Sequence, residues 1–165
     1  MKRIDKFGQQ TMGMPFGMMF AIFLIVVFIV IAFIAIGGFL DIGTSASVGM
    51  FYEDLQEAVD GAWSEQSAEF DFDIDLPSGI EEVCFGNLSN LITNRDTKYK
   101  EILNYDVYDA NVFLVPPEKA EDLQWKLIRH LDIAKITATK NPYCVSVRKG
   151  LRIKKGFYDR LVMIE

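Results

Sequence analysis

The feature that most constrains this chain is an unbroken apolar run close to its N-terminus. Residues 18–36 read MMFAIFLIVVFIVIAFIAI, and no charged residue occurs between Lys6 and Asp41. Nineteen consecutive apolar residues meet the length that an α-helix needs to cross the hydrocarbon core of a bilayer. We therefore predict one transmembrane helix over residues 16–40, which at about 37 Å would be somewhat tilted.

A cleaved secretory signal is the main alternative to a retained anchor. The apolar region of a signal peptide is about 7–15 residues long, which is shorter than this run. Ser45-Ala46-Ser47 has the small residues that a signal peptidase prefers, but it lies well beyond the run. The sequence therefore favours an uncleaved, single-pass anchor with the lipid bilayer as its partner. Beyond it remain about 125 residues, enough for one domain.

Positive charge is distributed unevenly on the two sides of the apolar run. The first six residues include three bases and one acid, and after them no Lys or Arg occurs until Arg95. Basic residues beside a membrane helix are retained on the cytoplasmic side. We therefore expect a protein of the cell membrane. Residues 1–15 would form a basic stub in the cytoplasm, and the domain after the helix would be extracytoplasmic.

The domain beyond the helix is itself divided by charge. Residues 41–94 contain 12 acids and no base, a net charge of −12, whereas residues 95–165 contain 14 bases and 10 acids, a net charge of +4. The acidic half would be repelled by anionic headgroups and by nucleic acid, so no nucleic-acid partner is expected. The two halves can attract each other within one molecule or between neighbouring molecules.

Residues 41–67 have the periodicity of a membrane-proximal and amphipathic helix. Gly37, Gly38 and Gly43 are candidates to end or bend the preceding helix. After them, apolar residues recur at helical spacing, and the acids fall mostly on the other faces. Such a stripe packs on the domain or on a neighbour. The apolar positions are Val48, Phe51, Tyr52, Leu55, Val59, Ala62 and Trp63.

From residue 68 the periodicity changes from that of a helix to that of a strand. Glu69–Leu76 alternates strictly, which predicts a strand with Phe70, Phe72, Ile74 and Leu76 on one face. A turn at Pro77–Gly79 would allow Ile80–Phe85 to return as a second strand. Glu118–Gln124 favours a short helix, and Trp125–Ile136 fits either helix or strand. Short β-branched runs indicate more strands at 110–115, 143–147, 151–153 and 161–164.

These elements predict an α+β fold. It has an N-terminal transmembrane helix, an amphipathic helix, and then a small, mainly antiparallel, β-rich extracytoplasmic domain over residues 68–165.

Two features are typical of an exported domain. Cys84 and Cys144 are the two cysteines, and an even number in an extracytoplasmic domain permits one disulfide. Two buried free thiols are the alternative. Asn87-Leu88-Ser89 matches the glycosylation acceptor pattern, so Asn87 is a candidate modification site.

The row Asp71, Asp73 and Asp75 is the obvious candidate for chemistry. With Glu82 it follows the carboxylate spacing of a calcium loop, but Leu76 stands where that loop needs glycine. An extended strand cannot wrap one ion, so a solvated strand face competes with a surface site for a divalent cation. The row also discourages pairing of sheet edges.

No residue pattern in the sequence predicts an enzyme or a cofactor. The one histidine, His130, has no neighbouring ligand or nucleophile in the sequence, so we interpret it as a structural or surface residue. The phosphate-binding, dinucleotide-binding and nucleophile-elbow glycine motifs do not occur. A membrane-tethered hydrolase therefore lacks a nucleophile–base pair to support it.

Gly13, Gly17 and Ala21 are spaced by four residues at the start of the predicted membrane helix. Small residues at this spacing let a second helix approach closely, so this ladder is a candidate packing surface. The alternative is that the two glycines form a loose entry to the helix.

The N-terminal layout resembles that of archaeal type IV pilins and pilin-like proteins. It consists of Lys6, Gly8-Gln9-Gln10, a long apolar helix, an amphipathic continuation and a small β-rich head. The resemblance implies cleavage after Gly8 and packing of the long helix with its copies in a filament core. Phe7 stands where that family commonly has Lys or Arg. The stretches Asp75–Phe85 and Asn141–Cys144 resemble uncharacterised archaeal single-pass membrane-anchored proteins.

We therefore expect a membrane-anchored surface or assembly protein, pilin-like and without catalytic activity. It would self-associate or bind a protein partner through its transmembrane and amphipathic helices. The alternative is an accessory or binding subunit of a larger membrane complex.

Overall fold

The computed structural model describes residues 13–94, 96 and 99–165, and at 13–15 and 38–42 it describes the backbone alone. The chain divides into two compact units, Met1–Asp41 and Ile42–Glu165. The predicted cleavage position after Gly8 and most of the basic stub lie outside the described residues. The fold is α+β, with an apolar N-terminal helix and antiparallel sheets, and this part of the prediction is confirmed.

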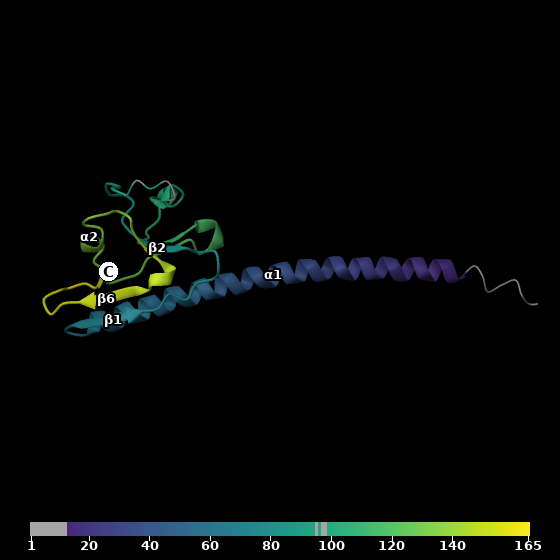
Figure 1. Ribbon diagram of the computed structural model, residues 1–165, viewed down its shortest axis with the longest axis horizontal. Coiled ribbons are helices and arrows are strands. Elements are labelled where there is room, and N and C mark those ends of the chain that lie inside the picture. The colour runs from purple at the N-terminus through teal and green to yellow at the C-terminus, as the bar shows by residue number, and fades with distance from the viewer. Residues whose placement is uncertain (1–12, 95, 97–98) are drawn as a thin grey trace, which may run out of the picture. The chain divides into compact units, whose positions relative to one another are not determined.

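The first element, helix α1, is assigned over Gly13–Ser64 (Figure 1). The helix therefore does not end at Gly37, Gly38 or Gly43, which were candidates to end or bend it. A glycine in a helix costs about 1 kcal/mol relative to alanine but retains the backbone donor and acceptor, so flanking helix formers carry the helix through.

The second unit contains two antiparallel sheets. Strands β1 (Ala68–Phe72), β6 (Leu151–Lys155) and β7 (Met163–Ile164) form a three-stranded sheet in that order. The four-stranded sheet has the order β4 (Trp125–Lys126), β3 (Val112–Val115), β2 (Glu82–Phe85) and β5 (Tyr143–Ser146). Short helical turns connect them: η2 (Ile102–Tyr105), η3 (Pro117–Lys119), α2 (Ile133–Ile136) and η4 (Val147–Lys149).

Strand pairing differs from the sequence prediction. We expected the chain to return after Pro77–Gly79 and pair with the first strand, but β1 pairs with β6, and β2 pairs with β3 and β5. The C-terminal strands are divided between the two sheets and do not form a sheet of their own. Strand β5 belongs to the four-stranded sheet, and β6 and β7 belong to the three-stranded sheet. Strand partners depend on contacts between distant segments, which local periodicity does not encode.

The limits of several elements also differ from those predicted. Strand β1 ends at Phe72, although the alternation of exposed Asp and half-buried apolar residues continues to Leu76. The predicted helix at 118–124 is reduced to η3. The ambiguous segment 125–136 contains both forms, with β4 at its start and α2 at its end.

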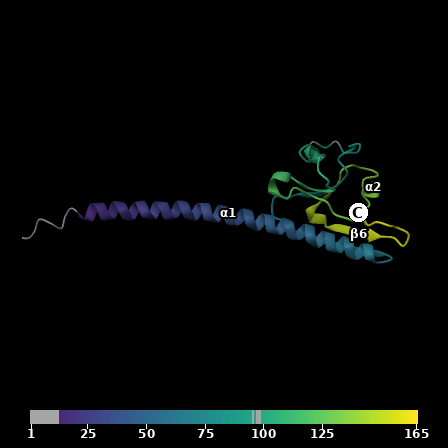
Figure 2. The same ribbon diagram turned by 180° about the vertical axis from the view of Figure 1, so that it is seen from behind.

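The main core lies between α1 and the two sheets. The predicted apolar stripe of the helix supplies Val48, Leu55 and Val59, each with 0% exposure. They pack with alternate residues of β2 and β3, such as Val83 and Leu114. Two views of the ribbon show β6 beside the last turns of α1 (Figures 1 and 2). Trp63, which we placed in the packed stripe of the helix, is instead 44% exposed, and Phe70, on the apolar face of β1, is 39% exposed.

A second, smaller core covers the opposite face of the four-stranded sheet. It is formed by the intervening residues of β2 and β3 and by the segment that links these strands. Because successive strand residues point to opposite faces, one short strand serves both cores. Its buried members are Cys84, Leu88, Tyr99, Ile102, Phe113 and Val115.

Asn141 fastens the loop that follows β2. Its Nδ2 donates to the backbone oxygens of Asn87, at 2.8 Å, and of Leu91, at 3.2 Å. Its buried Oδ1 has no hydrogen-bond donor in the described part of the chain. A Cβ at Gly86 would lie 2.9 Å from that oxygen and 3.1 Å from Cβ of Pro142. Glycine is therefore required at position 86 by close packing.

The substitution Gly86→Ala is expected to lower the free energy of unfolding by about 1–3 kcal/mol, as overpacking does in a tight site. Gly61→Ala in α1 is the matched control, because a Cβ there meets nothing within 4 Å. Helix propensity predicts that this control raises stability by up to about 1 kcal/mol. Urea unfolding, monitored by tryptophan fluorescence, measures both. Equal midpoints for the two variants would contradict the packing assigned to Gly86.

Candidate interaction surfaces

The apolar part of α1 is the most exposed hydrophobic surface of the chain. Phe16–Gly37, with a mean hydropathy of 3.4, is long and apolar enough to cross a membrane, and none of it is buried within the chain. Phe16 and Phe33 are 75% and 73% exposed. The core helix of a soluble domain is mostly buried by its own chain, and this segment differs from such a helix in its exposure.

The predicted helix ladder lies in this segment. Gly13 begins α1, Ala21 is exposed, and no atom lies within 4 Å of the position of a Cβ on Gly17. Gly37, Gly43 and Gly61 are equally open. No contact that the structure describes within the chain thus accounts for small residues at these sites, and helix packing through the ladder stays a prediction.

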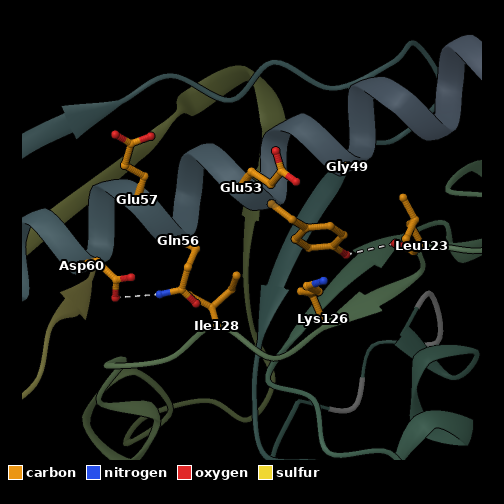
Figure 3. A pocket seen from close by; sticks show the side chains of 9 residues that line it. Gly49, Glu53, Gln56, Glu57, Asp60, Leu123, Lys126 and Ile128 are labelled. Carbon is orange, nitrogen blue, oxygen red and sulfur yellow. Dashed lines mark hydrogen bonds between the residues drawn. The ribbon is translucent and has the colours of Figure 1, made fainter.

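A groove of about 570 Å³ runs along α1 in the second unit (Figure 3). One wall is the helix, and the other is the segment that contains β4. The hydroxyl of Tyr52 donates to the backbone oxygen of Leu123 at 3.1 Å, and burial raises the pKa of this phenol. The residues lining the groove are Gly49, Tyr52, Glu53, Gln56, Glu57, Asp60, Leu123, Lys126 and Ile128.

The groove combines an apolar floor with an acidic rim. Tyr52 and Ile128 are 2% and 1% exposed and supply apolar atoms. Glu53 and Glu57 are exposed, and neither makes an ion pair with another residue that the structure describes. Lys126 is the one basic residue of the lining. The groove is therefore suited to an apolar group that carries positive charge.

Asp60 closes one end of the groove. It accepts hydrogen bonds from Nε2 of Gln56, at 2.8 Å, and lies 2.7 Å from Nδ1 of His130. The His130 ring stacks on Trp63, with 3.9 Å between ring centroids and 4° between ring planes. The Gln56 Oε1 accepts from the backbone N–H of Arg129 at 2.8 Å. These contacts hold α1 to the segment that contains Arg129 and His130. His130 therefore has a structural role.

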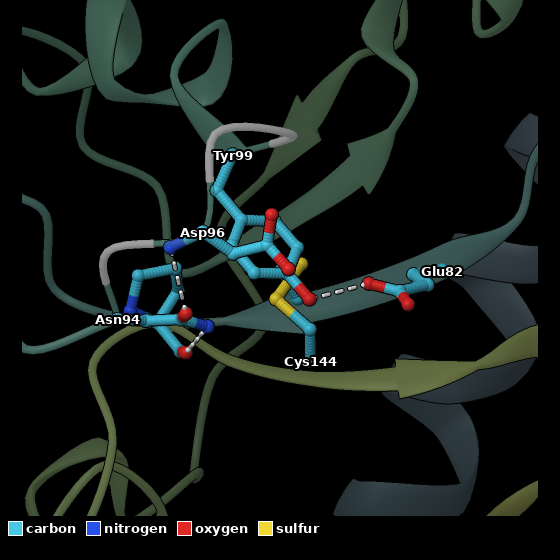
Figure 4. Close-up of a disulfide and its surroundings, with 7 residues drawn as sticks. Glu82, Asn94, Asp96, Tyr99 and Cys144 are labelled. Carbon is cyan, nitrogen blue, oxygen red and sulfur yellow. Dashed lines mark hydrogen bonds between the residues drawn. A yellow bond between two sulfur atoms is a disulfide. The ribbon is translucent and has the colours of Figure 1, made fainter.

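The two cysteines form a disulfide in the smaller core (Figure 4). Cys84 of β2 and Cys144 of β5 are directly opposed, with an S–S distance of 2.04 Å. A carboxylate oxygen of Glu82 lies within 4.8 Å of both sulfurs. Metal ligation needs thiolates, which a disulfide does not offer, so this trio is not a metal site. Glu82 accepts a hydrogen bond from the Tyr99 hydroxyl at 2.8 Å.

The acidic row and Glu82 occupy different sheets. Asp71 lies in β1 and accepts from Nε of Arg152 at 2.9 Å, whereas Glu82 is in β2. Asp73 and Asp75 follow β1 and are exposed. In the part of the chain that the structure describes, no set of three potential ligands within 4.8 Å includes a residue of this row. The structure thus does not bring the four predicted carboxylates together.

Asn87 lies on an exposed turn. Its Oδ1 accepts from the backbone N–H of Ser89 at 3.0 Å, a turn that asparagine favours. Its position at the surface is where an acceptor for glycosylation must lie, and modification there stays a prediction.

No sequence pattern pointed directly to the groove. Tyr52 was recognised on the apolar stripe of the amphipathic helix, and the carboxylates of the groove were recognised on its other faces. Leu123 lies in the segment predicted as a short helix, and Lys126 and Ile128 lie in the ambiguous segment 125–136. These three residues meet the helix through tertiary packing. The available signal was the run of carboxylates from Glu53 to Asp60 without a nearby base, which left positive charge to come from elsewhere.

Comparisons with protein-family models, with curated proteins and with solved structures found no match.

Proposed function

We propose that this chain is a single-pass membrane protein that acts by assembly or contact and not by catalysis. The observation that carries the proposal is the exposed apolar segment Phe16–Gly37, which none of the residues described by the structure buries. A lipid bilayer provides a matching apolar environment for a helix of this length. Residues 42–165 then form a folded head at the membrane surface.

The charge distribution supports an orientation with the N-terminus in the cytoplasm. Three bases precede the apolar segment, and the following residues 41–94 contain 12 acids and no base. Basic residues flanking a membrane helix are held on the cytoplasmic side. The Cys84–Cys144 disulfide is consistent with a head in an oxidising, extracytoplasmic compartment.

Assembly in a pilin-like manner is supported by the small residues of α1. Gly13, Gly17 and Ala21 share one side of the helix, and the open surface at Gly17 leaves room for another helix. A glycine in a helix costs about 1 kcal/mol of stability relative to alanine, and close packing of a second helix would compensate for that cost.

Sedimentation of the full chain in a mild detergent tests the proposal. We expect species larger than the monomer, and we expect the double substitution Gly17→Leu/Ala21→Leu to weaken their formation. Met19→Leu/Phe23→Leu, on other faces of the same segment, is the matched control and should have no effect. A strictly monomeric native chain would contradict assembly. Co-purification of one stoichiometric, unrelated protein would instead favour the accessory-subunit alternative.

A further inference from the structure

The loop that joins β6 to β7 exposes two adjacent aromatic side chains. Phe157 is 62% exposed and Tyr158 is 94% exposed, and their rings meet edge to face at 5.1 Å. In Figure 1 this loop, in yellow, extends past the arrowhead of β6. We call Phe157 and Tyr158, together with Arg160 two positions after Tyr158, the aromatic tip.

The tip is held by bonds at its base. The Asp159 carboxylate accepts from Nζ of Lys135, at 2.6 Å, and from the backbone N–H of Gly156, at 3.0 Å. These two bonds lower the pKa of Asp159 below its ordinary value. On the preceding strand, Nζ of Lys155 donates to the backbone oxygen of Trp63 at 2.6 Å. A loop fixed in this way loses little conformational entropy when it binds.

The tip presents positive charge together with its aromatic rings. Lys135 neutralises Asp159, whereas Arg160 is exposed and makes no ion pair within residues 13–94, 96 and 99–165. Lys154, on the preceding strand, lies 4.0 Å from Glu165. Exposed aromatic residues beside an arginine are the composition that dominates the centres of protein interfaces.

We propose that the aromatic tip of one copy docks into the acidic groove of a second copy. The groove is complementary to the tip. Its apolar floor at Tyr52, Leu123 and Ile128 would contact the aromatic rings, and the carboxylates of Glu53 and Glu57 would attract the arginine. Its volume of about 570 Å³ is within the range of pockets that enclose small ligands. This inference rests on the proposed function, because it identifies the partner and the surface through which the heads assemble.

The proposed contact joins two different surfaces and is therefore open-ended. Each copy has one tip and one groove, so a copy that fills a neighbour's groove still offers its own. Such head-to-tail contacts form rings or extended filaments, whereas a symmetric contact closes at the dimer. The tip follows the strand bonded to Trp63, near the C-terminal end of α1, and the groove begins at Gly49. Successive heads would thus be displaced along the helix direction.

Two double variants of the full chain in mild detergent test this contact by sedimentation velocity. The tip variant is Phe157→Ser/Tyr158→Ser, and the groove variant is Glu53→Lys/Glu57→Lys. We expect each variant alone to associate at least about tenfold more weakly than the native chain, as loss of an interface anchor does. An equal mixture should recover a dimer with one intact contact, formed by the tip of the groove variant and the groove of the tip variant.

Matched controls separate this contact from general changes of the surface. Leu91→Ser/Val107→Ser removes apolar residues that are 82% and 80% exposed elsewhere on the head, and Glu101→Lys/Glu118→Lys reverses two exposed acids outside the groove. Both controls should associate as the native chain does. Mixing Tyr158→Cys and Glu57→Cys chains with a short thiol cross-linker should also give a heterodimer, whatever the stability of the double variants.

The outcomes distinguish this inference from the proposed function. Native association by the tip and groove variants, or absence of the cross-linked heterodimer, would overturn the tip-to-groove contact and leave assembly through α1 in place. No gain on mixing the two variants would also overturn it, because it indicates a contact that is not head-to-tail. A monomeric native chain would overturn the proposed assembly and this contact together.

Discussion

Opening the Cys84–Cys144 disulfide is expected to lower the free energy of unfolding of residues 42–165 by roughly 4 kcal/mol, as the chain-entropy model gives for a loop of this size. The two cysteines are separated by 60 residues and connect β2 to β5. Without this link the unfolded chain gains conformational freedom, while the folded sheet keeps its backbone pairing. Urea unfolding of the full chain in detergent, with and without a reductant, measures the difference.

Tryptophan fluorescence reports on this transition directly. Trp63 is stacked on His130 and Trp125 on Tyr108, so both tryptophans lose a ring contact when the second unit unfolds. Cys84→Ala/Cys144→Ala supplies a control that is insensitive to reductant, and its midpoint should match that of the reduced native chain to within the small loss of packing. Identical midpoints for the oxidised and reduced native chain would show that the disulfide does not constrain the head.

Charging the centre of the apolar segment is expected to abolish stable insertion. Ile25 and Ile29 are 59% and 50% exposed and lie one turn apart in α1. On insertion scales an arginine at the centre of a membrane helix costs about 2.5–3.5 kcal/mol, so Ile25→Arg/Ile29→Arg should cost about 5–7 kcal/mol. The fraction of chain that stays with membranes after alkaline extraction should fall from nearly all to a minority.

Ile25→Leu/Ile29→Leu is the matched control for the arginine variant, because it keeps the segment apolar. It should be retained in membranes as the native chain is. Tryptophan fluorescence of both variants checks that residues 42–165 are folded, so that loss from the membrane is not mistaken for loss of structure. Full retention of the arginine variant would indicate that the segment does not lie in the hydrocarbon core.

Local periodicity carried most of what the sequence predicted correctly. Val48, Leu55 and Val59 recur at the spacing of one helix face, and each is fully buried in the main core. The alternation from Asp71 to Leu76 likewise matches the alternation of exposed and half-buried residues, even where the strand has ended. In both cases the face on which a residue lies follows from the period of its helix or strand. A sequence pattern therefore predicts its burial.

What the sequence could not supply depends on contacts between distant residues. The pairing of β1 with β6 joins residues about 80 positions apart, and it separates strands that a hairpin would have joined. The groove has the same origin, since Leu123 and Ile128 meet α1 only in the folded head. Asp71 and Glu82 match the carboxylate spacing of a calcium loop, but they lie in different sheets because β1 and β2 do not pair.

Protease digestion of sealed membrane vesicles of known sidedness tests the central claim most directly. The account predicts that in vesicles with the cytoplasmic face outward, residues 42–165 are protected until detergent opens the membrane. In vesicles or cells with the opposite sidedness, the head should be digested and a short fragment containing Phe16–Gly37 should stay in the membrane. Digestion of the head from the cytoplasmic side, or release of the intact chain from the membrane, would contradict a single-pass anchor with an extracytoplasmic head.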